Sequence, residues 1–151
     1  MKLAEALQER ADLNRNIEQL KSRLRNNVLV QEGETTAEEP GKLKRELDAA
    51  LARLSYLMAR INLTNSQSSV NGQSLTELIA KKDTLAVKLY AYKEIVHTAS
   101  QAAYRARNTE IKIKPAILVA DWQEEIDRTA KELRLLDNQL QQSNWTIDLI
   151  E

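Results

Sequence analysis

The residues that break helices are confined to three short stretches of this chain. Its three glycines and two prolines stand at Gly33, Pro40 and Gly41, at Gly72, and at Pro115. The long intervals between them are rich in Leu, Ala, Glu, Lys, Arg and Gln, which are good helix formers. Because glycine and proline end or weaken a helix, this spacing predicts four long helices.

Apolar residues in each of the four intervals recur at alternating steps of three and four. This is the spacing of a helix that packs along one face against other helices. The four stripes are Leu3, Ala6, Arg10, Leu13, Ile17, Leu20 and Leu24; Leu43, Leu47, Ala50, Leu54, Leu57 and Ile61; Leu75, Leu78, Lys82, Leu85, Leu89, Tyr92, Val96, Ala99 and Ala103; and Val119, Trp122, Ile126, Thr129, Leu133, Leu136 and Leu140. They predict a mainly α fold, a long antiparallel bundle of about four helices with coiled-coil packing, in a single domain over residues 1–151.

Two short stretches have the character of strands. Residues 28–30 read Val-Leu-Val, and residues 110–114 alternate polar and apolar side chains, which is the period of a half-buried strand. Each would leave its backbone unpaired if it were alone. We therefore expect these two stretches to form a small two-stranded β ribbon, within one chain or between two chains.

The second stripe is wider than one packing face needs. Leu51 and Met58 lie beside it and add apolar width. Arg10 and Lys82 interrupt the first and third stripes, and they either set the register of the helices or lay their stems along the edge of the core. The extra width indicates a second contact, and we expect the chain to form homo-oligomers through it.

Composition excludes several classes of protein. Cysteine is absent, and 22 basic residues balance 22 acidic ones, so neither thiol chemistry nor a global field for nucleic acid is indicated. A glutamate at position 5 interrupts any signal peptide, and the longest apolar run, residues 116–120, is far too short to span a membrane. We expect a cytoplasmic protein with no transmembrane segment and no cofactor. No catalytic motif is present, so an enzyme is not expected.

Polar residues near the end of the second stripe could bind a small ligand. Arg60, Asn62 and Asn65 offer a guanidinium and two amides, and the acidic loop carries Glu32 and Glu34 among its four carboxylates. These five residues are the candidate ligand-binding set. The alternative is structural, with Arg60 paired to a loop carboxylate and the asparagines closing the helix.

Two further patterns bear on metal and nucleic-acid binding. Glu94 and His97 stand three residues apart on a predicted helix, as in the Glu-x-x-His motif of di-metal bundles, but His97 is the only histidine.

Residues 81–114 hold eight basic residues against three acidic ones, interleaved with tyrosines, which could contact nucleic acid. Residues 121–151 carry eight acidic residues against three basic ones, so neutralisation between the two helices is favoured instead.

Several stretches, in order along the chain, resemble a family of small uncharacterised bacterial proteins labelled septicolysin. They are residues 1–7 (Met-Lys-Leu-Ala-Glu-Ala-Leu), 31–34 (Gln-Glu-Gly-Glu), 60–65 (Arg-Ile-Asn-Leu-Thr-Asn), 107–111 (Arg-Asn-Thr-Glu-Ile) and 144–145 (Asn-Trp). Asn108, Thr109 and Leu63 depart from the family pattern. The resemblance implies a bacterial cytoplasmic helical protein, and the label implies pore formation, in which amphipathic helices would be unmasked at a membrane.

The leading expectation is therefore a non-enzymatic structural or interaction protein that forms homo-oligomers through helical packing. A septicolysin-like helical pore former is one alternative, and a small ligand- or metal-binding protein is the other. A membrane would be a partner only for the pore former.

Overall fold

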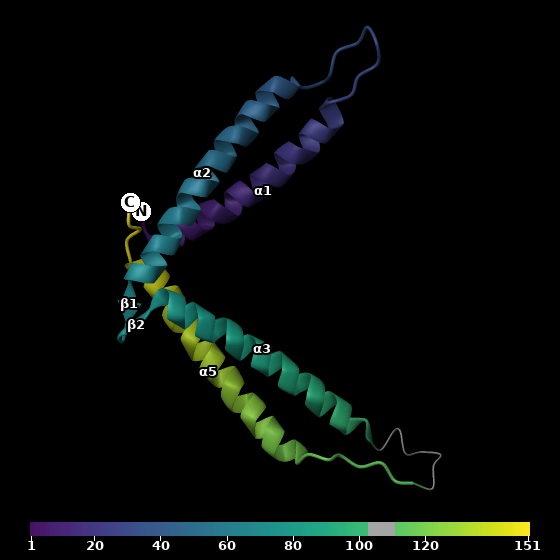
Figure 1. The fold of residues 1–151 in the computed structure, drawn as a ribbon, viewed down its shortest axis with the longest axis vertical. Coiled ribbons are helices and arrows are strands. Elements are labelled where there is room, and N and C mark those ends of the chain that lie inside the picture. The colour runs from purple at the N-terminus through teal and green to yellow at the C-terminus, as the bar shows by residue number, and fades with distance from the viewer. Residues whose placement is uncertain (103–110) are drawn as a thin grey trace. The chain divides into compact units, whose positions relative to one another are not determined.

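The computed structural model describes residues 1–102 and 111–151. Most of these residues lie in helices α1 (Leu3–Asn27), α2 (Pro40–Gln67), α3 (Leu75–Ser100) and α5 (Val119–Thr146). Strands β1 (Ser69–Val70) and β2 (Gln73–Ser74) form a small antiparallel sheet. The prediction of a mainly α fold with long helices and one two-stranded ribbon is confirmed (Figure 1).

The chain divides into two compact units. The first contains residues 1–74 and 143–151, and the second contains residues 75–142. Helices α1 and α2 lie side by side in the first unit, and α3 and α5 do so in the second (Figure 1). Helix α5 contributes residues to both units. A single domain over residues 1–151 stays a prediction.

The predicted stripes face inward wherever the structure describes them. In the first unit the stripe residues of α1 and α2 are buried or half-buried, and Leu3, Leu20, Leu43, Leu57 and Ile61 are almost completely enclosed. Burial of such side chains stabilises the fold by about 1.5–3 kcal/mol each. Helix propensity alone would not hold helices of this length in place, so the apolar faces determine how α1 and α2 pair.

An ion pair joins the same two helices at the surface. The Arg53 guanidinium of α2 donates two hydrogen bonds to the Glu9 carboxylate of α1, at 2.6 and 2.8 Å. The bidentate geometry favours the charged carboxylate, and it lowers the pKa of Glu9. The pair connects α1 to α2 at one point along the hairpin.

The two ends of the described chain meet in the first unit. Lys2 and Asp148 form an isolated antiparallel bridge, flanked by backbone hydrogen bonds from Leu3 to Ile147 and from Leu149 to Met1, each 2.9 Å long. The Lys2 ammonium also contacts the Asp148 carboxylate at 2.8 Å. This bridge attaches the segment after α5 to the start of α1.

The β ribbon lies elsewhere than predicted. Residues 28–30 and the described residues 111–114 are not strands, and Glu110 lies outside the described residues. The ribbon instead closes on Asn71 and Gly72, whose φ angles of 51° and 81° are both positive. An Asn-Gly pair is the preferred two-residue hairpin loop because it accepts positive φ at both positions. Turn chemistry, rather than β-branched composition, determines where this hairpin forms.

Helices α3 and α5 build the second unit with fewer enclosed residues. Leu75 and Leu78 are the buried residues of α3, and the remaining described residues of its stripe are half-buried. The Tyr92 and Trp122 rings pack at a centroid distance of 4.9 Å between the two helices. Two helices cannot enclose each other, so one side of α3 remains open to solvent.

Candidate functional site

The five candidate ligand residues do not converge on one point of the fold. Glu32 and Glu34 lie in the loop that precedes α2, while Arg60, Asn62 and Asn65 lie near its carboxyl end. About twenty residues of helix separate the two groups, which corresponds to about 30 Å. The alternative, in which Arg60 pairs with Glu32 or Glu34, is therefore wrong, because the continuous helix α2 holds them apart. Whether either group binds a ligand stays a prediction.

The three polar residues at the end of α2 do not share one face. Residues two apart on a helix do not share a face, so Arg60 and Asn62 point to different sides of α2. The Arg60 guanidinium lies over the Tyr56 ring, 5.4 Å from its centroid. Its Nε atom is buried and has no hydrogen-bond partner among the described residues. Neither the Asn62 amide nor the Asn65 amide is a hydrogen-bond partner of this atom.

Thr64, between these residues, has the structural role that sequence reasoning did not assign. Its hydroxyl donates to the Arg60 carbonyl oxygen at 2.8 Å and accepts from the Ile150 amide at 2.9 Å. Its side chain is completely buried. No local signal in the sequence distinguishes Thr64 from the polar residues around it, because its partner comes from the other end of the chain.

The acidic loop is anchored by one of its carboxylates. Glu38 pairs with Arg23 of α1, whose Nε lies 3.0 Å from Oε2, and this hydrogen bond lowers the pKa of Glu38. The Glu38 amide donates to the Asn27 side-chain oxygen at 3.0 Å. These contacts close the loop against the end of α1 and leave Glu32 and Glu34 exposed.

The Glu94 and His97 side chains lie exposed on α3. Within residues 1–102 and 111–151, no group of three His, Asp or Glu side chains is arranged to hold a metal ion. A metal role for this pair stays a prediction.

Basic residues of α3 are matched by acidic residues of α5. Ion pairs among the described residues join Lys81 with Glu132 at 3.3 Å, Lys82 with Asp137 at 3.2 Å, and Lys88 with Glu125 at 2.7 Å. These pairs support the interpretation that acidic residues of α5 neutralise the basic residues of α3. They do not favour the alternative, in which the basic residues contact nucleic acid. Lys82, which interrupts the apolar stripe, extends to a carboxylate at the edge of the packed face.

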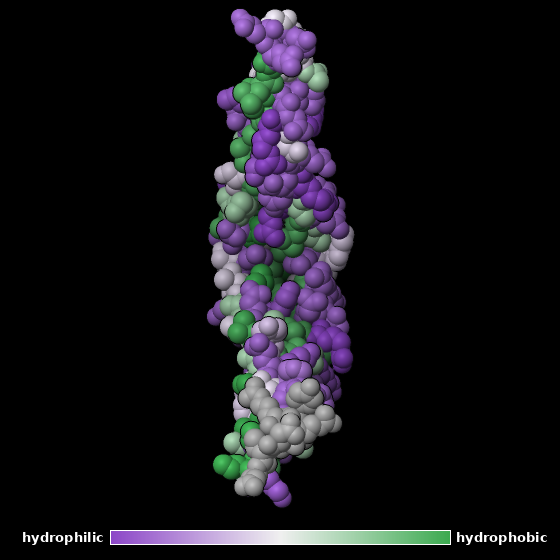
Figure 2. Space-filling model, turned by 90° about the vertical axis from the view of Figure 1, so that its right-hand side faces the viewer, coloured by the Kyte–Doolittle hydropathy of each residue, from purple (hydrophilic) through white to green (hydrophobic). Residues whose placement is uncertain are grey.

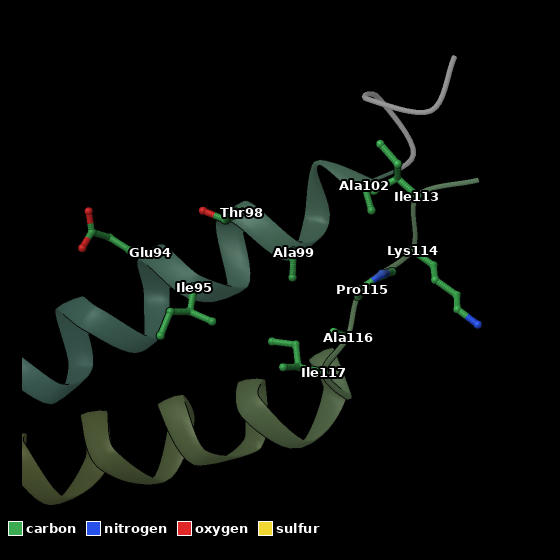
Figure 3. Close-up of a pocket in the computed structure, with 10 residues that line it drawn as sticks. All are labelled: Glu94, Ile95, Thr98, Ala99, Ala102, Ile113, Lys114, Pro115, Ala116 and Ile117. Carbon is green, nitrogen blue, oxygen red and sulfur yellow. The ribbon is translucent and has the colours of Figure 1, made fainter. Parts of the chain in front are cut away.

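An apolar groove lies at the far end of α3 in the second unit (Figure 3). It has a volume of about 540 Å³ and runs between α3 and the segment that leads into α5. Ile95 and Ala99 point from α3 toward this segment, and Ile117 points back toward α3 (Figure 3). The Glu94 carboxylate points away, and Lys114 extends outward at the rim (Figure 3). The groove therefore offers an apolar floor with a basic edge.

The surface also carries apolar side chains outside the groove. Hydrophobic patches interrupt the mostly hydrophilic face drawn in Figure 2. Val87 and Tyr90 on α3 are 69% and 68% exposed, and Leu51 and Met58 on α2 are 44% and 48% exposed. The sequence contains apolar residues on more than one side of α3. The single apolar stripe defined for this helix in the sequence analysis does not include Val87 or Tyr90.

These features define a helical protein with exposed apolar surfaces and without a recognisable catalytic constellation among its described residues. Residues 10–149 match a family of unknown function, DUF6847, and the chain belongs to that family. A solved structure of a functionally unknown conserved protein from Corynebacterium diphtheriae is similar over 99% of both chains, with 32% sequence identity and a TM-score of 0.92. No curated protein matches the chain.

The comparisons correct the resemblance to septicolysin. The family that matches is DUF6847, and neither it nor the similar structure carries a septicolysin description. The four short stretches and the Asn-Trp pair that suggested the resemblance were too brief to identify a family. None of the helices in the described part of the chain is long and apolar enough to cross a membrane.

Proposed function

We propose that this chain is a non-enzymatic interaction protein that assembles with copies of itself through helical packing. The observation that carries the proposal is the exposed apolar side of α3. Helix α5 covers the face formed by Leu85, Leu89 and Tyr92, whereas Val87 and Tyr90 remain on the surface. A helix that is apolar on more than one side is usually buried on more than one side. A second helical partner would provide that burial.

Helix α2 supports the same proposal in the first unit. Leu51 and Met58 are seven residues apart, so they lie on one line along the helix, about two turns from each other. They flank the face that packs on α1, and both remain partly exposed. A partner helix laid along this flank would extend the packed face without disturbing α1.

The test is the mass of the protein in solution. Light scattering after size-exclusion chromatography should show a multimer of the 17.2 kDa chain. The charged variants Val87→Glu and Leu51→Glu/Met58→Glu should each shift the mass toward the monomer if the corresponding face is used, because burying an unpaired charge is costly. Ala49→Glu is the control, since it adds the same charge to an exposed position on the other side of α2.

The variants also show which helix forms the interface. A multimer that only one variant disrupts would assign the interface to that helix. A wild-type protein that is monomeric across the micromolar range would overturn the proposal.

A further inference from the structure

The loop after α1 exposes three consecutive apolar side chains. Val28, Leu29 and Val30 are all exposed, with Leu29 at 87%. Single exposed apolar residues are common on protein surfaces, whereas contiguous ones mark contact sites. We call residues 28–34 the loop tip.

The loop tip stands on a well-anchored base. The Asn27 side chain donates to the Arg23 carbonyl oxygen at 2.8 Å and accepts from the Glu38 amide at 3.0 Å. Within the loop, the Glu34 amide donates to the Gln31 carbonyl oxygen at 3.0 Å, and Gly33 supplies a positive φ of 86°. The loop tip is therefore presented by a fixed support, which reduces the entropy that a docking step would cost.

The apolar groove of the second unit has the complementary chemistry. Its volume of about 540 Å³ lies within the range of ~300–1,000 Å³ that is typical of binding pockets. Ile95, Ala99 and Ile117 form its floor (Figure 3). Lys112 and Lys114 are exposed along the segment that borders it. The groove thus combines an apolar floor with positive charge. The loop tip combines apolar side chains with the negative charge of Glu32 and Glu34.

The backbones of residues 28–30 in the loop tip and 112–114 beside the groove are also free to pair with each other. Residues 28–30 and 112–114 are neither helical nor paired as strands in the described structure. Both carry branched apolar residues, which favour extended pairing. An extended segment can add to another extended segment through main-chain hydrogen bonds while its alternate side chains enter pockets.

We infer that the loop tip of one copy of this chain docks into the apolar groove of a second copy, with Leu29 on the groove floor and the loop glutamates beside Lys112 and Lys114. This inference rests on the proposed self-assembly and adds a contact between copies that is separate from the apolar sides of α2 and α3. The two surfaces differ, so a reciprocal contact between two copies gives a two-fold dimer, whereas a head-to-tail contact closes a ring or extends a filament.

The absence of cysteine from the chain allows a direct test. Two variants, Leu29→Cys and Ile113→Cys, are purified separately, mixed and oxidised with a mild thiol oxidant. The mixture, but neither variant oxidised alone, should give a disulfide-linked dimer at twice the 17.2 kDa chain mass on a non-reducing gel. Both positions are exposed, and circular dichroism checks that the helices are intact.

Controls separate this contact from other arrangements. Mixing Ala49→Cys with Ile113→Cys should give little dimer. The charge variant Lys112→Glu/Lys114→Glu should reduce cross-linking in the Ile113→Cys background, and Glu32→Lys/Glu34→Lys in the Leu29→Cys partner should restore it. Restoration by opposite charges would show that the two charged segments attract each other, and the Ala49→Cys mixture measures cross-linking by random collision.

Three outcomes would overturn the inference. The first is a Leu29→Cys variant that links only to itself, which would mean that two loop tips meet. The second is a Leu29→Cys/Ile113→Cys double variant that cross-links only within one chain. The third is a wild-type multimer, shown by light scattering, whose mixed variants do not cross-link. This last result would leave the proposed self-assembly standing, whereas a monomeric wild-type protein would overturn both.

Discussion

The backbone amide of Ile150 donates a hydrogen bond to the hydroxyl oxygen of Thr64 at 2.9 Å, across 86 positions of sequence. Thr64 is completely buried at the end of α2, and its hydroxyl proton is directed to the Arg60 carbonyl oxygen. One side chain therefore acts as both donor and acceptor, and it attaches the segment after α5 to α2.

Replacing Thr64 with valine should destabilise the protein. Valine keeps the shape of threonine but removes the acceptor, so the Ile150 amide loses its partner at a cost of about 1–3 kcal/mol. Urea denaturation followed by circular dichroism measures the change in the free energy of unfolding. Thr84→Val is the control, because the Thr84 hydroxyl contacts only carbonyls of its own helix at an exposed position, and it should change stability by less than about 0.5 kcal/mol. Equal effects of the two variants would refute the role assigned to Thr64.

The pair between Glu9 and Arg53 should make stability depend on pH. The hydrogen bond from Arg53 lowers the pKa of the Glu9 carboxyl below its ordinary value near 4.5. A carboxyl whose pKa is lower in the folded state stabilises that state above the unfolded pKa, and this contribution is lost as the pH falls through the folded pKa. The wild type should therefore exceed Glu9→Gln in stability at pH 7, and the difference should shrink below about pH 4.5.

Urea midpoints at pH 7, 5, 4 and 3 measure this difference. Glu124→Gln is the matched control, since Glu124 is an exposed carboxylate of α5 without an ion pair among the described residues. A gap between wild type and Glu9→Gln that stays constant across the whole range would show that Arg53 does not stabilise the charged carboxylate.

The two tryptophans can show whether the two units unfold together. Trp122 lies in the second unit and Trp145 in the first, and both belong to α5. Because one continuous helix supplies residues to both units, we expect a single cooperative transition. The variants Trp122→Phe and Trp145→Phe each leave one fluorescent reporter, and their urea midpoints at one protein concentration should coincide with that of circular dichroism. Two separate midpoints would mean that residues 1–151 contain two independent domains.

The helices could be predicted from the sequence because their signals are local. Breakers at Gly33, Gly72 and Pro115 separated the helices, and apolar residues at steps of three and four marked the faces that the structure buries. The ribbon prediction failed for a local reason as well. Strand-like composition at residues 28–30 was weighed above the Asn71-Gly72 turn signal, although backbone conformation constrains a hairpin more strongly than side-chain preference does.

The candidate site was less accessible to sequence reasoning. Residues of suitable chemistry at Glu32, Glu34 and Arg60 could be identified, but their separation depends on the direction and length of α2. The groove was not predicted, because Ile95 and Ile117 belong to segments whose approach depends on how α3 packs against α5.

The sequence by itself determined the helical class of this protein, the inward face of each helix, and the charge balance between α3 and α5. These follow from a periodicity of 3.6 residues and from composition, which act within a few turns of the chain. Only the tertiary structure decided that Thr64 receives the Ile150 amide, that Arg60 lies far from the acidic loop, and that α3 keeps an apolar side exposed. Such features depend on contacts between segments far apart in sequence, and no local pattern specifies the partner of a side chain.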